Sequence, residues 1–337
     1  MRRHRSRRHR RTTPRRWYCL ALIVAATTFA AACGLQAGSS LPFTMNPGSI
    51  QHNDNLTGVT LTVGSKEFTE QVLLGYILAF SLQAAGAEIR DLTSIVGSQS
   101  TRAAQLSGQV QLTYEYTGNG WINYLGHEKP LPDPMEQFKA VRDADVAENN
   151  IDWVALAPMD NTYALAASKA VVERTGVRTL SQYAELAKTT PAQAKTCVDT
   201  EFNVRRDGFP GMAQAYGLDP ATVFRSVLQT GIIYNATASG TECLFGEVYT
   251  TDGRIKGLDL VLLTDNRSFF PHYNPAVTLS TDLARQHPEI EQIMTPVSQA
   301  LTNDEVMELN RRIDVDGEDI AAVARDWLVN KGFVAAG

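Results

Sequence analysis

Apolar and polar residues alternate in two distinct periods from about residue 59 onwards. Val59, Leu61 and Val63 alternate with threonines, and this period of two predicts a strand. Over the next segment, Thr69–Ala85, apolar residues recur every three or four positions, which predicts a helix that ends before Gly86. The two patterns continue through these ranges: Glu88–Ile95, Ser98–Ser107, Val110–Tyr114, Pro134–Glu148, Trp153–Ala157, Tyr163–Ser168, Ser181–Lys188, Lys195–Val198, Glu242–Tyr249 and Leu258–Leu263.

The order of these elements predicts the fold class. Strands and helices alternate, which favours α/β layers with largely parallel sheets. The C-terminal part is mainly helical, with a capping box at Thr302–Glu305 and a helix over Asp319–Asn330. No Pro/Ser-rich linker divides the body. If it forms two domains, the chain therefore crosses between them more than once.

The first 32 residues have the pattern of an export signal. Nine arginines precede an uncharged, mostly apolar stretch that begins at Trp17 and ends in small residues. This stretch is shorter than the roughly 20 apolar residues of a membrane span. Arg15-Arg16 keeps a twin-arginine export route open beside the general secretory route. We expect residues 1–32 to be a signal peptide.

The next residues resemble a lipid-attachment site. Small residues run into Cys33-Gly34, as at a bacterial lipoprotein cleavage site, although Ala30 stands where a large aliphatic residue is usual. We expect a lipid on Cys33 to anchor the protein to the outer face of the cell membrane. Residues 33–56 are rich in Gly, Ser, Pro and Asn, which predicts a flexible linker.

Charge argues against nucleic-acid binding. The net charge of the 337 residues is −5, but the nine arginines of the signal account for much of the positive charge. Without them, 22 of the 31 basic residues remain against 36 acidic ones, a net charge of −14. So acidic a body repels phosphates.

The cysteines predict one disulfide and no metal site. Cys19 lies in the signal and Cys33 at the anchor, so Cys197 and Cys243 remain to pair in an oxidising compartment. Neither has a CxxC partner or a histidine at zinc-ligand spacing. No phosphate-binding loop or nucleophile motif is present, so we expect no metal, no cofactor and no catalytic residue. An exported enzyme that uses Glu115 or Asp252 is a remote alternative.

Tyrosines stand where predicted strands meet turns. Tyr116 precedes Thr117-Gly118, Tyr163 enters a strand, Tyr249 leaves one, and Tyr273 follows Phe269–His272. In open α/β sheets ligands bind beyond the strand ends. These four tyrosines are therefore candidate ligand contacts, with core packing as the alternative for each.

Six motifs in one order resemble the osmoprotectant-binding proteins of ABC importers, the glycine betaine/carnitine/choline family. The resemblance covers about residues 59–333. It implies a type II periplasmic-binding fold with two α/β lobes and a central ligand cleft. Lobe one would hold residues 57–159 and 265–337, and lobe two residues 160–264. The motifs are Gly64–Gln71, Tyr114–Gly118, Asn161–Leu165, Phe202–Gly211, Tyr249–Ile255 and Phe269–Pro271.

The resemblance also implies roles for individual residues. A box of tyrosines would hold the trimethylammonium head of the ligand, which has no N–H and is gripped by ring faces. Arg205 matches a clamp for the ligand's carboxylate. Lys66 and Asn119 match contacts to its polar end, and Gln71 a contact at a helix start, whereas Tyr114 would belong to the core. The matching box positions are Tyr116, Tyr163, Tyr249 and Tyr273.

The implied partners are a small quaternary-ammonium ligand and the permease subunits of an ABC importer, with the binding protein itself a monomer. Relatives often carry Thr or Asp where this chain has Asn119. A neutral asparagine leaves glycine betaine and choline both open. Another small carboxylate or amino-acid-like solute on the same scaffold is the main alternative, because Arg205 would suit any carboxylate.

Overall fold

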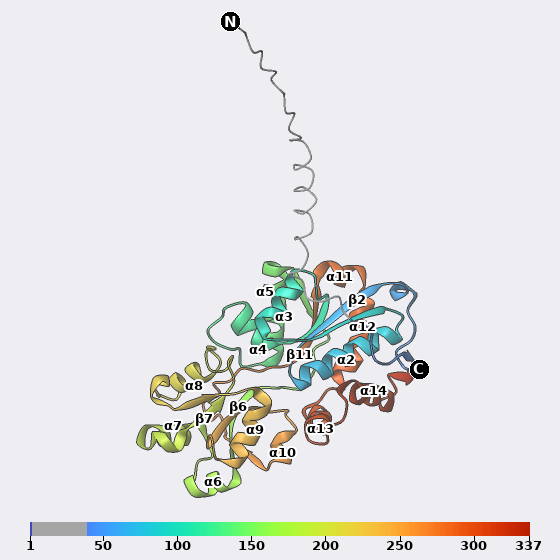
Figure 1. Ribbon diagram of the computed structural model, residues 1–337. Helices are drawn as coiled ribbons and strands as arrows, with labels where there is room; N and C mark the ends of the chain where they lie inside the picture. The colour runs from blue at the N-terminus through green and yellow to red at the C-terminus, as the bar shows by residue number, and fades with distance from the viewer. Residues whose placement is uncertain (2–38) are drawn as a thin grey trace. The chain divides into compact units, whose positions relative to one another are not determined.

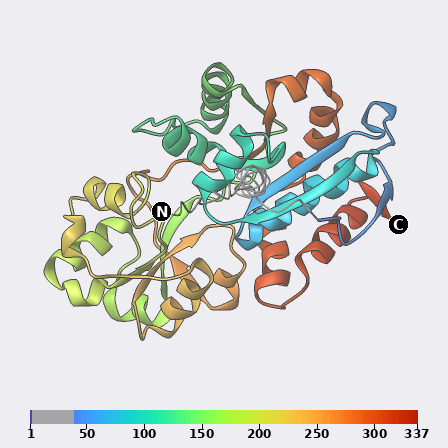
Figure 2. The same ribbon diagram turned by 45° about the horizontal axis from the view of Figure 1, so that its top comes forward.

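The computed structural model describes Met1 and residues 39–337. This part of the chain contains two five-stranded sheets and a two-stranded ribbon. Figures 1 and 2 show the sheets in two groups of elements, which we call the first and second lobes. The first lobe combines elements from early and late in the described chain, and the second lobe is built from those between.

The sheet of the first lobe has the order β3-β2-β4-β11-β5. Strand β2 runs parallel to β3 and β4, whereas β11 is antiparallel to both β4 and β5. The strands span Thr60–Lys66 (β2), Glu88–Ile95 (β3), Leu112–Tyr116 (β4), Ile151–Val154 (β5) and Pro275–Ser280 (β11).

The sheet of the second lobe has the order β10-β6-β9-β7-β8. Here β7 is parallel to β8 and β9, and β6 is antiparallel to β9 and β10. The strands span Tyr163–Ser168 (β6), Thr196–Val198 (β7), Arg225–Val227 (β8), Phe245–Tyr249 (β9) and Leu260–Leu262 (β10).

The expectation of largely parallel sheets is wrong, because two of the four pairings in each sheet are antiparallel. The chain leaves the first sheet after β5 and returns to it as β11. The chain re-enters the sheet at the same edge at which β5 ended, so β11 runs in the direction opposite to β5. Alternation of strands and helices along the sequence does not reveal such a return.

Helix α2 is the centre of the first lobe's core. Leu73, Ile77 and Phe80 of this helix are fully buried, and α2 packs against β2 and α14. The α-helices span Thr69–Ala84 (α2), Ser98–Leu106 (α3), Thr117–Asn119 (α4), Pro134–Asn149 (α5), Lys169–Thr175 (α6), Leu180–Thr189 (α7), Phe209–Ala215 (α8), Thr230–Ser239 (α9), Arg254–Gly257 (α10), Thr281–Gln286 (α11), Glu289–Gln299 (α12), Asn303–Asp314 (α13) and Ile320–Asn330 (α14). Short η turns span Asp54–Leu56 (η1), Gly120–Tyr124 (η2), Pro191–Ala194 (η3) and Pro220–Thr222 (η4).

Residues 45–56 are part of the folded body, which corrects the expected flexible linker over this stretch. Strand β1 (Met45–Pro47) pairs with β12 (Val334–Ala336) near the C-terminus. Met45, Ile50 and Leu56 are buried in the core of the first lobe. Because this stretch is rich in Asn, Pro and Gly, its few apolar residues formed no periodic pattern that would predict a folded segment. The predicted signal peptide and Cys33 lie outside the described residues.

The chain passes between the lobes twice, through residues 155–162 and 263–274. The predicted disulfide is confirmed: Cys197 in β7 is bonded to Cys243, just before β9, with Cα atoms 5.7 Å apart. Both cysteines are buried within the second lobe. The bridge therefore ties two parts of one lobe and leaves the crossovers free.

Candidate ligand-binding site

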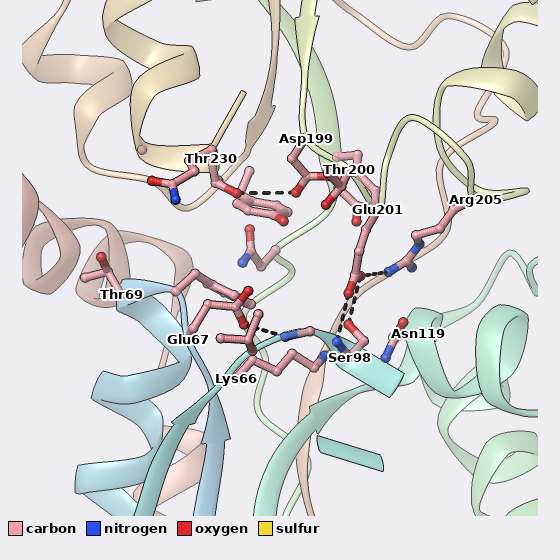
Figure 3. A pocket seen from close by; sticks show the side chains of 18 of the residues that line it. Lys66, Glu67, Thr69, Ser98, Asn119, Asp199, Thr200, Glu201, Arg205 and Thr230 are labelled. Carbon is pink, nitrogen blue, oxygen red and sulfur yellow. Dashed lines mark hydrogen bonds and ion pairs between the residues drawn. The ribbon is translucent and has the colours of Figure 1, made fainter. Parts of the chain in front are cut away.

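A cavity of about 750 Å³ lies between the two lobes, lined by residues of both. Figure 3 shows Lys66, Glu67, Ser98 and Asn119 of the first lobe facing Asp199, Thr200, Glu201 and Thr230 of the second. All four predicted box tyrosines line it, with Arg205, Lys66 and Asn119. The other lining residues are Phe68, Thr69, Val96, Gly97, Asn161, Val227, Leu228, Gln229, Gly231 and Arg254.

The four tyrosines gather because of how their strands pair. Strands β6 and β9 are antiparallel, so the first residue of β6, Tyr163, is the register partner of the last residue of β9, Tyr249. Tyr116 ends β4, and Tyr273 precedes the neighbouring strand β11. Ring centroids of Tyr163 lie 5.4 Å from Tyr249 and 5.5 Å from Tyr273, and those of Tyr116 and Tyr273 are 6.3 Å apart.

Phe68 is a fifth aromatic residue beside the four tyrosines, and sequence reasoning missed it. We call these five residues the aromatic group. Its ring stacks on Tyr249 at 5.4 Å and on Tyr116 at 6.3 Å between centroids. It lies in the turn between β2 and α2, inside the first of the six motifs. Its place between a strand end and a helix start was the available signal, the same one that identified the tyrosines.

Buried carboxylates hold two of the tyrosine hydroxyls. The hydroxyl of Tyr116 donates to Glu70 at 2.6 Å, and that of Tyr273 donates to Asp207. Burial raises the pKa of Tyr116, Tyr163, Tyr249 and Tyr273 well above the ordinary value. The rings are therefore neutral phenols with fixed faces.

Glu70 itself is a buried carboxylate that joins both lobes. Besides Tyr116, it accepts hydrogen bonds from Asn161 in the first crossover, Thr251 of the second lobe and Asn310 in α13. Burial raises its pKa, and these hydrogen bonds offset part of that rise. It does not line the cavity but orients a ring that does.

Arg205 lines the cavity, but carboxylates of the protein already hold its guanidinium. Nε and Nη2 donate to the two oxygens of Asp207 at 2.9 and 2.7 Å, and Nη1 donates to Glu201 at 3.1 Å. Burial alone would raise the pKa of Asp207, but Arg205 holds it below its ordinary value. The guanidinium also lies 5.5 Å from the ring centre of Tyr163.

Lys66 is paired in the same way. Its ammonium lies 2.7 Å from Glu115 Oε1, and both side chains are almost fully buried. Glu115 also accepts from Asn119 Nδ2 at 3.2 Å and from the Tyr124 hydroxyl at 2.7 Å. The Lys66 ammonium is 5.2 Å from the ring centre of Tyr116, at the edge of the aromatic group.

Gln71 is the one predicted contact that does not line the cavity. It is 1% exposed, and its Oε1 accepts from the backbone N–H of Lys66 at 3.4 Å. The first turn of α2 directs this side chain towards the end of β2. Gln71 therefore supports Lys66 from behind in this structure, and its contact with a ligand stays a prediction.

The second lobe contributes polar groups that sequence reasoning missed. Asp199 accepts from the Thr230 hydroxyl at 3.3 Å and from the backbone N–H of Phe202 at 2.7 Å. Glu201 reaches across the cavity, where it accepts from the backbone N–H and the hydroxyl of Ser98 at 2.8 and 2.9 Å (Figure 3). Both follow the short strand β7 and lie between the predicted strand Lys195–Val198 and the motif that begins at Phe202, so no sequence signal marked them.

The two carboxylates considered for catalysis are both bound by cations. Glu115 pairs with Lys66, and Asp252 pairs with Arg254 at 2.5 Å. Within residues 39–337 no group of His, Cys, Asp and Glu side chains is arranged to hold a metal ion. Nor does this part of the chain contain a helix long and apolar enough to cross a membrane.

Comparison with known proteins finds one matching family model and several similar proteins. Residues 59–330 match the model of the substrate-binding domain of ABC-type glycine betaine transport systems. The chain is 34% identical to the glycine-betaine-binding protein of Pseudomonas aeruginosa, over 80% of this chain and 87% of that protein. It is 29% identical to the ergothioneine transport permease/ergothioneine binding protein of Helicobacter pylori, over 81% of this chain and 48% of that protein.

The fold is also similar to that of solved structures of binding proteins. The structure of apo YehZ from Escherichia coli superimposes with a TM-score of 0.61 at 28% identity, over 81% of this chain and 99% of that one. The expected type II periplasmic-binding fold is therefore confirmed. The ligands named for relatives of similar identity differ, so similarity alone does not choose among them.

Proposed function

Because the chain belongs to the family of substrate-binding domains of ABC-type glycine betaine transport systems, we propose that it captures a quaternary-ammonium compound of the glycine betaine or choline type in this cavity. Members of the family bind their substrate outside the cytoplasm. The protein would act as a monomer that closes its lobes on the ligand and delivers it to the permease subunits of an importer.

The observation that carries the proposal is the group of aromatic rings in the cavity. A trimethylammonium group has no N–H to donate, so only ring faces and charge can attract it. Each aromatic face contributes about 0.5–2 kcal/mol to such a cation. Tyr116, Tyr163, Tyr249, Tyr273 and Phe68 all line the cavity, and the centroids of neighbouring rings are 5.4–6.3 Å apart.

Calorimetry tests the proposal directly. Glycine betaine, proline betaine, carnitine and choline should include at least one ligand with a Kd below about 1 mM, and loss of the methyl groups should weaken it. Tyr249→Ala should weaken that ligand by roughly 2- to 30-fold, the value of one ring face. Circular dichroism would confirm that the variant is folded. Binding of an ordinary amino acid, with no binding of any of the four compounds, would contradict the proposal.

We further propose that residues 1–32 direct export and that a lipid on Cys33 anchors the protein. What supports this is the arginine-rich and apolar pattern followed by Cys33-Gly34. Mass spectrometry of the membrane-associated protein should find the lipid, and Cys33→Ser should release the protein from the membrane. Retention of Cys33→Ser at the membrane would contradict the anchor.

A protein that captures a solute and delivers it to an importer releases that solute unchanged. We therefore propose that the protein is not an enzyme. Lys66 holds Glu115 and Arg254 holds Asp252, which suits structural anchors better than a general base. Incubation of the protein with its bound ligand, followed by mass analysis, should return the ligand unchanged.

A further inference from the structure

Each cation that lines the cavity has an ion-pair partner that lies behind it. Lys66 pairs with Glu115, Arg205 with Asp207 and Arg254 with Asp252, at 2.5–2.7 Å. None of the three partner carboxylates lines the cavity. The positive charges of the site are therefore matched within the protein before any ligand arrives. The members of these pairs are 2–15% exposed.

The remaining charged residues of the cavity are all acidic: Glu67, Asp199 and Glu201. Among the residues that the structure describes, neither Glu67 nor Asp199 has a salt-bridge partner. Glu201 shares Arg205 with Asp207. Asp199 and Glu201 together form what we call the acidic wall, on the second lobe.

A further carboxyl group lies behind the acidic wall. Glu247 in β9 is 1% exposed, and its Oε2 accepts from the backbone N–H of Asp199 at 2.8 Å. Its Oε1 is buried and has no hydrogen-bond partner in the described chain. Burial raises the pKa of Asp199, so a positive group beside it would gain more than its Coulomb attraction in water.

A ligand carboxylate would meet the opposite conditions. To be clamped by Arg205, it would have to compete with Asp207, which already forms two hydrogen bonds to the guanidinium in nearly dry surroundings. Removing one member of such a pair leaves the other charge buried and uncompensated. The carboxylate would also lie near the acidic wall, which repels it.

The cavity has room for more than a small head group. At about 750 Å³ it has the size of sites that hold drug-sized ligands. The five aromatic residues line this cavity together with Asp199 and Glu201, and Figure 3 shows Asp199 and Glu201 on the second lobe. A ligand with a tail could therefore occupy both parts at once.

We infer that the acidic wall is a second subsite, and that the cavity selects ligands with a trimethylammonium head and a positively charged or hydrogen-bond-donating tail over zwitterions with a carboxylate tail. The inference rests on the proposed function, because it needs the head in the aromatic group. It deepens that function by assigning the ligand's net charge.

A series of three ligands of matched length tests the inference by calorimetry. Aminopropyl-, propyl- and carboxypropyl-trimethylammonium share one head and one spacer and differ only in the charge of the tail. We expect the amino compound to bind at least about tenfold tighter than the propyl compound, and the carboxy compound at least about tenfold weaker. Added salt should shrink both differences.

Substitution of Asp199 in the acidic wall is the second test of the inference. Asp199→Asn should reduce the preference for the amino over the propyl compound by about tenfold or more. Asp259→Asn is the matched control, because Asp259 is an exposed carboxylate of the same lobe that pairs with Lys169 outside the cavity. It should leave the preference unchanged.

The outcomes separate the two proposals. If the carboxy compound binds as tightly as the amino compound or more tightly, the inference is wrong and the proposed function stands. If none of the three binds, the aromatic group does not hold a trimethylammonium head, and both are wrong. The ligand series uses the unmodified protein, so it decides the matter even if Asp199→Asn does not fold.

Discussion

Buried carboxylates behind the cavity organise the site at the scale of single residues. Glu70 orients Tyr116, Asp207 holds Tyr273 and Arg205, and Glu115 holds Lys66. Asp207 and Glu115 form salt bridges with cations, whereas Glu70 and Glu247 form none within residues 39–337. Burial raises the pKa of both Glu70 and Glu247, and the charge of Asp199 raises that of Glu247 further. These two carboxyl groups should make folding stability depend on pH.

The sign of this dependence follows from the raised pKa of Glu247. An acid whose pKa is higher in the folded protein contributes stability that is present below its unfolded pKa and lost as the pH rises through its folded pKa. Glu247→Gln keeps an acceptor for the Asp199 N–H but cannot ionise. We expect the variant to gain roughly 1–3 kcal/mol of unfolding free energy relative to wild type at pH 8, and less at pH 5.

Urea unfolding at the two pH values measures this difference. Glu242→Gln is the control, since Glu242 is exposed in the same lobe and hydrogen bonds with Lys195 lower its pKa. It should show no gain at the higher pH. A larger gain of Glu247→Gln at pH 5 than at pH 8 would show that the carboxyl group is stabilised in its ionised form.

At the scale of elements, strand β7 presents the acidic wall although it is only three residues long. Asp199 follows it directly, and Glu201 comes two residues later. Cys197 ties this strand to Cys243, at a sequence separation of 46 residues. Closing a loop of this length restricts the unfolded chain, which in the chain-entropy model stabilises the folded state by about 4 kcal/mol.

The double variant Cys197→Ala/Cys243→Ala should therefore lose about 4 kcal/mol of unfolding free energy, measured by urea denaturation. Reduction of the unmodified protein with dithiothreitol should produce a loss of the same size, and it should produce none in the double variant. Coincident unfolding curves for the double variant and the oxidised wild type would mean that the bridge does not stabilise the lobe.

At the scale of the whole described body, Glu201 joins the two lobes across the cavity. Helix α3 begins in the first lobe after Gly97, which has no side chain to cap it. Glu201 of the second lobe accepts from the first-turn N–H of Ser98 and so satisfies a free donor of that helix. This contact forms only when the lobes are close together, so it favours the closed state even without ligand.

Glu201→Ala should shift the ligand-free protein towards an open state. Loss of a helix cap costs about 0.5–2 kcal/mol, which would change the ratio of open to closed molecules roughly 2- to 30-fold. Small-angle X-ray scattering should report a larger radius of gyration for the variant than for wild type. Glu185→Ala, an exposed substitution on α7, serves as the control, and a variant as compact as this control would rule out the contact as a latch.

The sequence by itself determined the local features of this protein. Periods of two and of three to four residues located the main strands and helices, and six ordered motifs identified the family and placed tyrosines at strand ends. These features depend on chain neighbours, so a linear pattern carries them. The pairing of Cys197 with Cys243 followed because the other two cysteines were assigned elsewhere.

Only the tertiary structure decided the direction of the strands and the charge of the site. Strand β11 is antiparallel because the chain returns from the other lobe, and β1 pairs with a strand at the opposite end of the described body. The Arg205 guanidinium pairs with Asp207, two positions away, and Lys66 meets Glu115 from 49 positions away. Ion pairing and burial depend on where side chains point and on which residues come together in a nearly dry space, and the pattern of apolar and polar residues along the chain does not contain that information.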